Sequence, residues 1–294
     1  MNRCAQLART GILSLAAVTW GAQSSFASAP DHGHAEPAAK SSAPAPAASA
    51  NHDDTPEAVA PDAALKLLVD GNRRFVDAAT EGLRRDDTRR CETTVGGQHP
   101  FAAVLSCADS RVPAELVFDQ GIGDLFVVRV AGNVADTDEI GTIEYGVDHL
   151  GTRLVVVLGH TKCGAVTAVV NSNDSHGSAH GAAPLSPNLA GLLDNIAPAA
   201  EKARKNNPQL KGNALVAAAI RLNVMRSIED LLAHSDSLRV AAQAGKIKLV
   251  GGVYDIHSGI IDWLGPHPTR PSCAAPPPPT PGPAKAYSRR SRPS

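Results

Sequence analysis

Residues 101–111 read FAAVLSCADSR, and they join a short apolar run to a group of reactive side chains. The apolar part shows no polar alternation, which is typical of a parallel strand that is covered on both faces. Cysteine, aspartate and arginine follow it directly. The stretch therefore predicts a buried strand over residues 101–106 whose carboxyl end carries chemistry.

Similar apolar runs recur further along the chain, over residues 125–130, 153–158 and 247–254. Helical periodicity lies before and between them, in residues 62–79, 138–150, 165–170, 189–203 and 213–234. Asp62 is the expected N-cap of the first helix. Helices that alternate with strands imply right-handed crossovers. The predicted fold class is therefore α/β, with a parallel-dominated central sheet and helices on both faces.

The composition of the 294-residue chain excludes several classes of protein. Hydrophobic residues make up 43% of it, which is enough for a full core, and aromatic residues only 3%, which favours an α/β protein over a β-sandwich. The formal net charge of −1 argues against binding to nucleic acid or to anionic membranes. A basic run at residues 84–90 is interrupted by two aspartates and is expected to be a solvated face.

Residues 1–27 have the pattern of an export signal. Basic residues precede a short apolar run, and small residues follow it, as in a secretory signal peptide. Cleavage is expected after Ala27, with Ala29 as the rival position. The run is shorter than the roughly 20 residues that span a bilayer, although an uncleaved anchor remains the alternative. We therefore expect a periplasmic protein without a membrane span in the mature chain.

Two further segments differ in composition from the middle of the chain. Residues 28–60 are rich in alanine, proline and histidine, and residues 265–294 are rich in proline. Such segments hold too few bulky apolar side chains to form a core, so both are expected to be disordered. The folded domain is therefore predicted to span residues 61–264.

Two of the predicted strands bring metal-binding side chains to one edge of the sheet. Cys107 follows the first strand, and His160 and Cys163 follow the third. Ligands collect at the carboxyl ends of parallel strands, and two thiolates with one imidazole form a known catalytic zinc set with an open fourth position. Gly159 and Gly164 are expected to let the backbone turn tightly there.

Other interpretations of the cysteines stay open. In an oxidising compartment, Cys107 and Cys163 could form a disulfide. A closed structural zinc site would instead use Asp109 as a permanent fourth ligand. Cys91 and Cys273 lie outside this group, and the sequence does not decide whether they pair or stay free.

The motif SCADSRVP (106–113), followed by GHTKCG (159–164), resembles the paired signatures of β-class carbonic anhydrases. The resemblance covers nearly all of residues 61–264. It implies the β-carbonic anhydrase fold, a Zn²⁺ cofactor and the reversible hydration of CO₂ to bicarbonate and a proton. Further agreement is found in GNRRF (71–75), FVVR (126–129), GN (132–133) and IEY (143–145).

The resemblance also implies roles for the residues around the metal. Asp109 and Arg111 match a dyad in which Arg111 holds the carboxylate away from the metal, whereas in a closed form Asp109 binds the metal itself. The implied zinc ligands are Cys107, His160 and Cys163. Two other functions remain open on this scaffold, namely hydrolysis of CS₂ or COS, and a non-catalytic zinc- or CO₂-binding module with Asp109 locked on zinc.

A substrate pocket is implied in the same way. Gln98 matches a glutamine that hydrogen-bonds the substrate, and Phe126, Ala131 and Tyr145 fall where the family lines its CO₂ pocket, partly from a neighbouring subunit. We therefore expect a homo-oligomer, either a dimer or a tetramer. The allosteric subtype of the family has a tryptophan where this chain has Val104, which puts a regulatory bicarbonate site in doubt.

Overall fold

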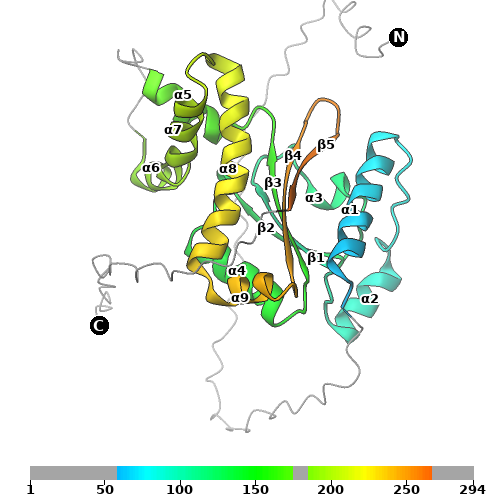
Figure 1. Cartoon of the computed structure of the whole chain (residues 1–294). Helices are drawn as coiled ribbons and strands as arrows, with labels where there is room; N and C mark the ends of the chain where they lie inside the picture. The colour runs from blue at the N-terminus through cyan, green and yellow to red at the C-terminus, as the bar shows by residue number, and fades with distance from the viewer. Residues whose placement is uncertain (1–57, 175–184, 267–294) are drawn as a thin grey trace, which may run out of the picture. The chain divides into compact units, whose positions relative to one another are not determined.

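The computed structural model describes residues 58–174 and 185–266 of the chain (Figure 1). The predicted signal peptide, nearly all of the segment 28–60 and most of the tail 265–294 lie outside these residues. Cys273 lies outside them as well. No helix in the described part is both long and apolar enough to cross a membrane.

A five-stranded sheet with the order β2-β1-β3-β4-β5 forms the centre of the described part (Figure 1). Neighbouring strands from β2 to β4 are parallel, and β5 is antiparallel to β4. The predicted parallel-dominated α/β fold is confirmed, although β5 was not predicted. The strands are β1 (Ala102–Cys107), β2 (Leu125–Val130), β3 (Leu154–His160), β4 (Lys248–Tyr254) and β5 (Ile261–Pro266), the last of which extends beyond the predicted end of the domain.

Helices connect the strands, and their bounds correct several predictions. Residues 189–203 form two helices rather than one, because Pro198 in the first turn of the second cannot continue a preceding helix. Asp62 is not an N-cap, since Ala60 occupies that position without a side-chain bond. The helices are α1 (Pro61–Val76), α2 (Asp87–Gly96), α3 (Ala114–Val117), η2 (Ala131–Asn133), α4 (Thr137–Asp148), α5 (Gly164–Asp174), α6 (Pro187–Asp194), α7 (Ala197–Asn206), α8 (Gly212–His234) and α9 (Asp236–Gln243).

Two apolar clusters cover the two faces of the sheet. Successive residues of a strand point to opposite faces, so β1 and β3 contribute alternately to both clusters. One cluster is completed by α1 and α3, and the other by α4 to α9. Cys107 and Cys163 lie in the second cluster. The reactive end of β1 therefore faces the layer that contains α8.

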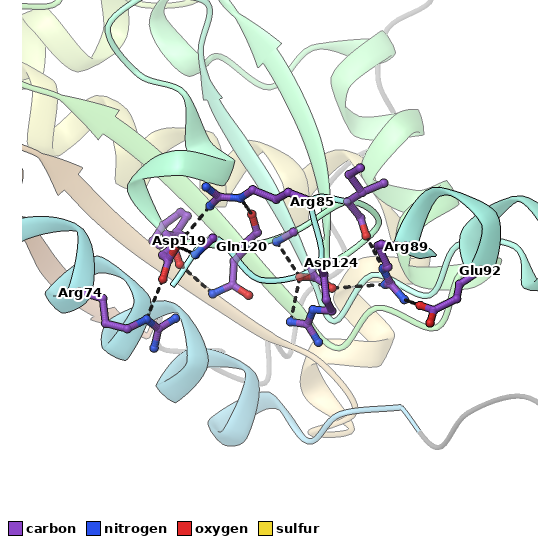
Figure 2. A network of polar contacts seen from close by, with 12 residues as sticks. Arg74, Arg85, Arg89, Glu92, Asp119, Gln120 and Asp124 are labelled. Carbon is purple, nitrogen blue, oxygen red and sulfur yellow. Dashed lines mark hydrogen bonds and ion pairs between the residues drawn. The ribbon is translucent and has the colours of Figure 1, made fainter. Parts of the chain in front are cut away.

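A network of ion pairs attaches α1 and α2 to the loop after α3 (Figure 2). Arg74 and Arg85 pair with the fully buried carboxylate of Asp119. Asp124 pairs in turn with Arg84 and Arg89. The basic run was expected to be a solvated face, but three of its arginines pair with two buried carboxylates. The prediction failed because these carboxylates lie more than 30 residues further along the chain.

Candidate metal centre

Three predicted ligands meet at the carboxyl edge of the sheet. Cys107 ends β1, His160 ends the neighbouring strand β3, and Cys163 lies just before α5. Their sulfur and nitrogen atoms all lie within 4.8 Å of one another, and all three residues are buried. Cys107 and Cys163 are free thiols, so the alternative of a disulfide between them is wrong. The spacing suits three ligands of a single metal ion.

The orientation of His160 fits a metal ligand. Its Nδ1 lies 3.0 Å from the carbonyl oxygen of Thr161. Because a carbonyl only accepts, Nδ1 carries the proton and Nε2 presents a lone pair. This Nε2 is buried and has no hydrogen-bond partner among the described residues. A buried polar atom without a partner is costly, and a bound cation would remove that cost.

The two thiols differ in acidity. Hydrogen bonding with the Cys163 thiol and with the Gly132 N–H lowers the pKa of Cys107, although burial opposes this change. The same contact with Cys107, together with burial, raises the pKa of Cys163. A metal ion binds cysteine as the thiolate, so binding to both sulfurs would release any proton that they carry.

Asp109 and Arg111 form a two-bond ion pair beside the cluster. The Arg111 guanidinium donates from Nε to Oδ1 over 2.9 Å and from Nη2 to Oδ2 over 2.7 Å. These bonds hold the pKa of Asp109 well below its usual range. Oδ2 of Asp109 lies 3.8 Å from Nε2 of His160. The carboxylate thus stays charged next to the cluster while Arg111 holds it in place.

Comparison with known proteins assigns the chain to a family. The family model for carbonic anhydrase matches residues 102–261. The chain is 36% identical over 200 residues to carbonic anhydrase 2 of Mycobacterium tuberculosis, and this match covers 68% of the chain and 90% of that relative. This chain belongs to the carbonic anhydrase family. A carbonic anhydrase of Mycolicibacterium smegmatis is 37% identical over 202 residues, which cover 69% of the chain and 92% of the relative.

The fold of this carbonic anhydrase agrees with that of solved β-class structures. It is similar to the b-carbonic anhydrase CafA of Aspergillus fumigatus, with a TM-score of 0.52, 26% identity and coverage of 68% of the chain and 90% of CafA. It is also similar in fold to the beta-carbonic anhydrase CcaA, with a TM-score of 0.53, 24% identity and coverage of 69% and 92%.

The predicted pocket residues divide into two groups. Ala131 precedes Gly132, whose N–H contacts the Cys107 sulfur, and so lies at the cluster. Phe126 and Tyr145 contact each other, with ring centroids 6.1 Å apart. However, Phe126 pairs with the second residue of β1, which places it about 13 Å along the strand from the cluster. These two aromatic rings therefore do not enclose the cluster of their own subunit.

Gln98 lies still further from the cluster of its own chain. It is exposed and precedes β1, whereas Cys107 ends that strand. Phe101, at the entry to β1, donates its N–H to the carbonyl of Asp124. Gln98 therefore lies near the amino edge of the sheet, opposite the metal ligands.

Arg129 has a structural role at this centre that was not predicted from the sequence. The Arg129 guanidinium donates from Nε to the carbonyl of Cys107 over 3.2 Å and from Nη2 to the carbonyl of Asp109 over 2.6 Å. It thus fixes the backbone on both sides of Ala108. Arg129 is the charged residue within the apolar run of β2, and this exception could have indicated that its side chain has a specific partner.

Proposed function

We propose that this chain is a zinc enzyme that catalyses the reversible hydration of CO₂ to bicarbonate and a proton. The observation that carries the proposal is the charged pair of Asp109 and Arg111, which lies 3.8 Å from the unpartnered Nε2 of His160. A catalytic site needs such a poised polar group beside an open metal position. The family assignment points to the same reaction.

Cys107, His160 and Cys163 would hold the zinc ion. Two thiolates and one imidazole are a catalytic zinc set that leaves one position open. The ion would supply Lewis acidity that ionises a water molecule at neutral to mildly alkaline pH. Zinc binds cysteine as the thiolate, and the Gly132 N–H that donates to the Cys107 sulfur over 3.3 Å would stabilise that form.

Asp109 would orient the attacking water. Its carboxylate can accept a hydrogen bond from that water and so aim an oxygen lone pair at CO₂. Arg111 prevents Asp109 from taking the open position itself, because the guanidinium holds both carboxylate oxygens. This pairing favours a catalytic site over a binding module in which Asp109 is a permanent ligand.

A partner subunit would complete the substrate pocket. Gln98, Phe126 and Tyr145 lie away from the cluster of their own chain, and Tyr145 is 48% exposed. A second copy of the chain could bring these side chains to the metal centre, with the Gln98 amide donating to the substrate. We therefore propose a homodimer or a homotetramer. A fully active monomer in sedimentation at assay concentration would contradict it.

We further propose that the chain is exported to the periplasm, with its mature form starting near Ser28. The basic, apolar and small-residue pattern of residues 1–27 supports this proposal. N-terminal sequencing of protein from a periplasmic fraction tests it. An intact Met1 on protein found in the cytoplasm would refute export.

Stopped-flow hydration of CO₂ by the zinc-loaded protein tests the reaction, with CS₂ and COS as competing substrates. The wild type should hydrate CO₂, and Arg111→Ala should lose most activity while keeping its zinc, because Asp109 is then free to bind the metal. Arg239→Ala is the matched control, since Arg239 pairs with the exposed Asp236 far along the chain from the ligands. Hydrolysis of CS₂ or COS without CO₂ hydration, or full activity of Arg111→Ala, would overturn the proposal.

A further inference from the structure

Helix α8 carries two polar side chains within its buried face. Asn223 is 1% exposed and Ser227 is 2% exposed. Their buried neighbours on the same helix include Ile220, Val224 and Ile228, all of which are apolar. Burying an amide or a hydroxyl in such surroundings is costly unless its hydrogen bonds are made. The two side chains therefore need specific partners.

Both side chains bond to consecutive carbonyls of the short turn η2. Asn223 donates from Nδ2 to the Gly132 carbonyl over 2.7 Å. The Ser227 Oγ lies 2.9 Å from the Asn133 carbonyl and 3.0 Å from the Asn223 carbonyl of its own helix, so its single proton is shared between these two acceptors. The two carbonyls of η2 lie 91 and 94 residues away along the chain. The two bonds thus connect the middle of α8 to one turn at the metal centre.

The turn η2 has a backbone shape that needs outside support. Gly132 has a φ of 76° and Asn133 a φ of 46°, so two successive residues are in the left-handed region. That region is unfavourable for a residue with a side chain and persists where the surroundings enforce it. A Cβ on Gly132 would also lie 2.5 Å from Cδ1 of Ile196.

This backbone conformation directs the Gly132 N–H toward the metal centre. It donates to Sγ of Cys107 over 3.3 Å. The Gly132 N–H and carbonyl belong to adjacent peptide units that are joined by the φ and ψ of Gly132. A bond from Asn223 that holds the carbonyl unit in this turn therefore helps to set the direction of the N–H. A hydrogen bond to a thiolate withdraws charge from the sulfur, so it changes how strongly that sulfur donates to a metal.

We propose that Asn223 and Ser227 are positioning residues of the metal centre. They hold η2 so that the Gly132 N–H points at the Cys107 sulfur, which fixes the direction of the sulfur and limits the charge it donates. This inference rests on the proposed function in that it takes Cys107, His160 and Cys163 as ligands of one metal ion.

Cobalt(II) in place of zinc provides the test, because its sulfur-to-metal charge-transfer band reports the donor strength of the thiolates directly. Asn223→Leu keeps the branching at Cγ, with two methyl groups in place of the amide, and removes the bond to Gly132. We expect its band to move to longer wavelength, because the sulfur regains charge. We expect its zinc affinity in chelator competition to fall roughly tenfold to a hundredfold, because the sulfur also loses its fixed direction. Ser227→Ala should show a smaller change in the same direction.

Ile228→Val is the matched control, since it trims a buried side chain of the same helix that does not bond to η2. It should leave the band and the zinc affinity unchanged. The proposal is overturned if Asn223→Leu matches the wild type in both readouts, or if Ile228→Val changes them equally. Should Asn223→Leu fail to fold, Ser227→Ala decides alone by the same criteria.

These readouts separate the inference from the proposed reaction. A wild type that binds cobalt with a thiolate band but does not hydrate CO₂ overturns the reaction and leaves the positioning role to be judged on the band. A wild type without any thiolate band overturns both.

Discussion

Replacement of Asp119 by asparagine tests how the N-terminal helices are attached to the sheet. The Asp119 carboxylate is fully buried and accepts hydrogen bonds from the side chains of Arg74 and Arg85 and from the backbone N–H groups of Glu81 and Gly82 (Figure 2). Asparagine has the same shape but no charge, and its NH₂ group cannot accept. The variant would therefore leave two guanidinium groups without their carboxylate.

The expected loss of stability follows from the exposure of the remaining partners. Removing one member of a buried ion pair costs about 3–5 kcal/mol. The side chains of Arg74 and Arg85 are 29% and 32% exposed, so water can partly solvate them and the lower end applies. A loss of about 3 kcal/mol lowers the melting temperature of a domain of this size by about 6–12 °C.

Thermal unfolding followed by circular dichroism measures the difference. Protein and zinc concentrations must be equal for all variants, because metal and subunit binding also raise the melting temperature. Asp236→Asn is the control, since that carboxylate is 88% exposed and pairs with Arg239 at the surface; exposed pairs contribute little. A melting temperature of Asp119→Asn within about 2 °C of the wild type would refute the reasoning.

The pH dependence gives an independent check on Asp119. Burial alone would raise the pKa of Asp119, but the hydrogen bonds from Arg74, Glu81 and Gly82 outweigh it, so the pKa is lowered. A lowered folded-state pKa means that the charge stabilises the fold above the unfolded value of about 3.9 and that this contribution is lost as pH falls through the folded value. The difference between wild type and variant should be constant from about pH 5 to 8 and shrink below about pH 4.

Three other predictions concern the metal, the packing of α1 and the pH–rate profile. Cys107→Ser should lose zinc, because a neutral hydroxyl replaces a thiolate; stoichiometric zinc by metal analysis would contradict this. Gly71→Ala should melt well below the wild type, since its Cβ would lie 1.8 Å from the Phe118 carbonyl oxygen. CO₂ hydration in stopped-flow should rise above neutral pH, because water must lose a proton whereas Asp109 is already ionised; equal rates at acid and alkaline pH would be inconsistent with it.

The strands could be predicted where consecutive residues are apolar, because such runs are typical of strands that are buried on both faces. The strands β1 to β4 are apolar runs, and each was placed within two residues of its observed bounds. This apolar signal is missing for β5, which contains Asp262, Gly265 and Pro266. Its place is set by the turn after β4, where the Asp255 N–H donates to the Ile260 carbonyl. Such a contact belongs to the folded hairpin and leaves little trace in the segment itself.

The metal ligands could be predicted because each lies directly after a recognisable strand. Cys107 and His160 end neighbouring parallel strands, so local pattern and strand order together bring them to one edge. Asn223 and Ser227 carry no comparable signal, because a polar residue in a helix is normally solvated. Their role depends on a contact with a turn more than 90 residues away, and only the fold creates that contact.

Gly159 shows how the metal-binding motif and α8 depend on each other. Gly159 and Gly164 were expected to allow a tight turn, but neither is among the glycines with positive φ, and Lys162, with a φ of 58°, makes the left-handed turn instead. Gly159 lies inside β3, where a Cβ would be 2.6 Å from Cγ2 of Val224. Its small size therefore serves the close approach of α8.

That approach has a consequence for the centre itself. Val224 also packs closely on Gly251 of β4, where an added Cβ would lie 2.9 Å from Cγ1 of Val224. Helix α8 therefore packs closely on two adjacent strands at this level. Asn223 is the residue before Val224, and its amide reaches the Gly132 carbonyl only because the helix lies this near the sheet. The glycine before His160 thus contributes to the metal centre through packing, by letting α8 hold the turn that supports the Cys107 sulfur.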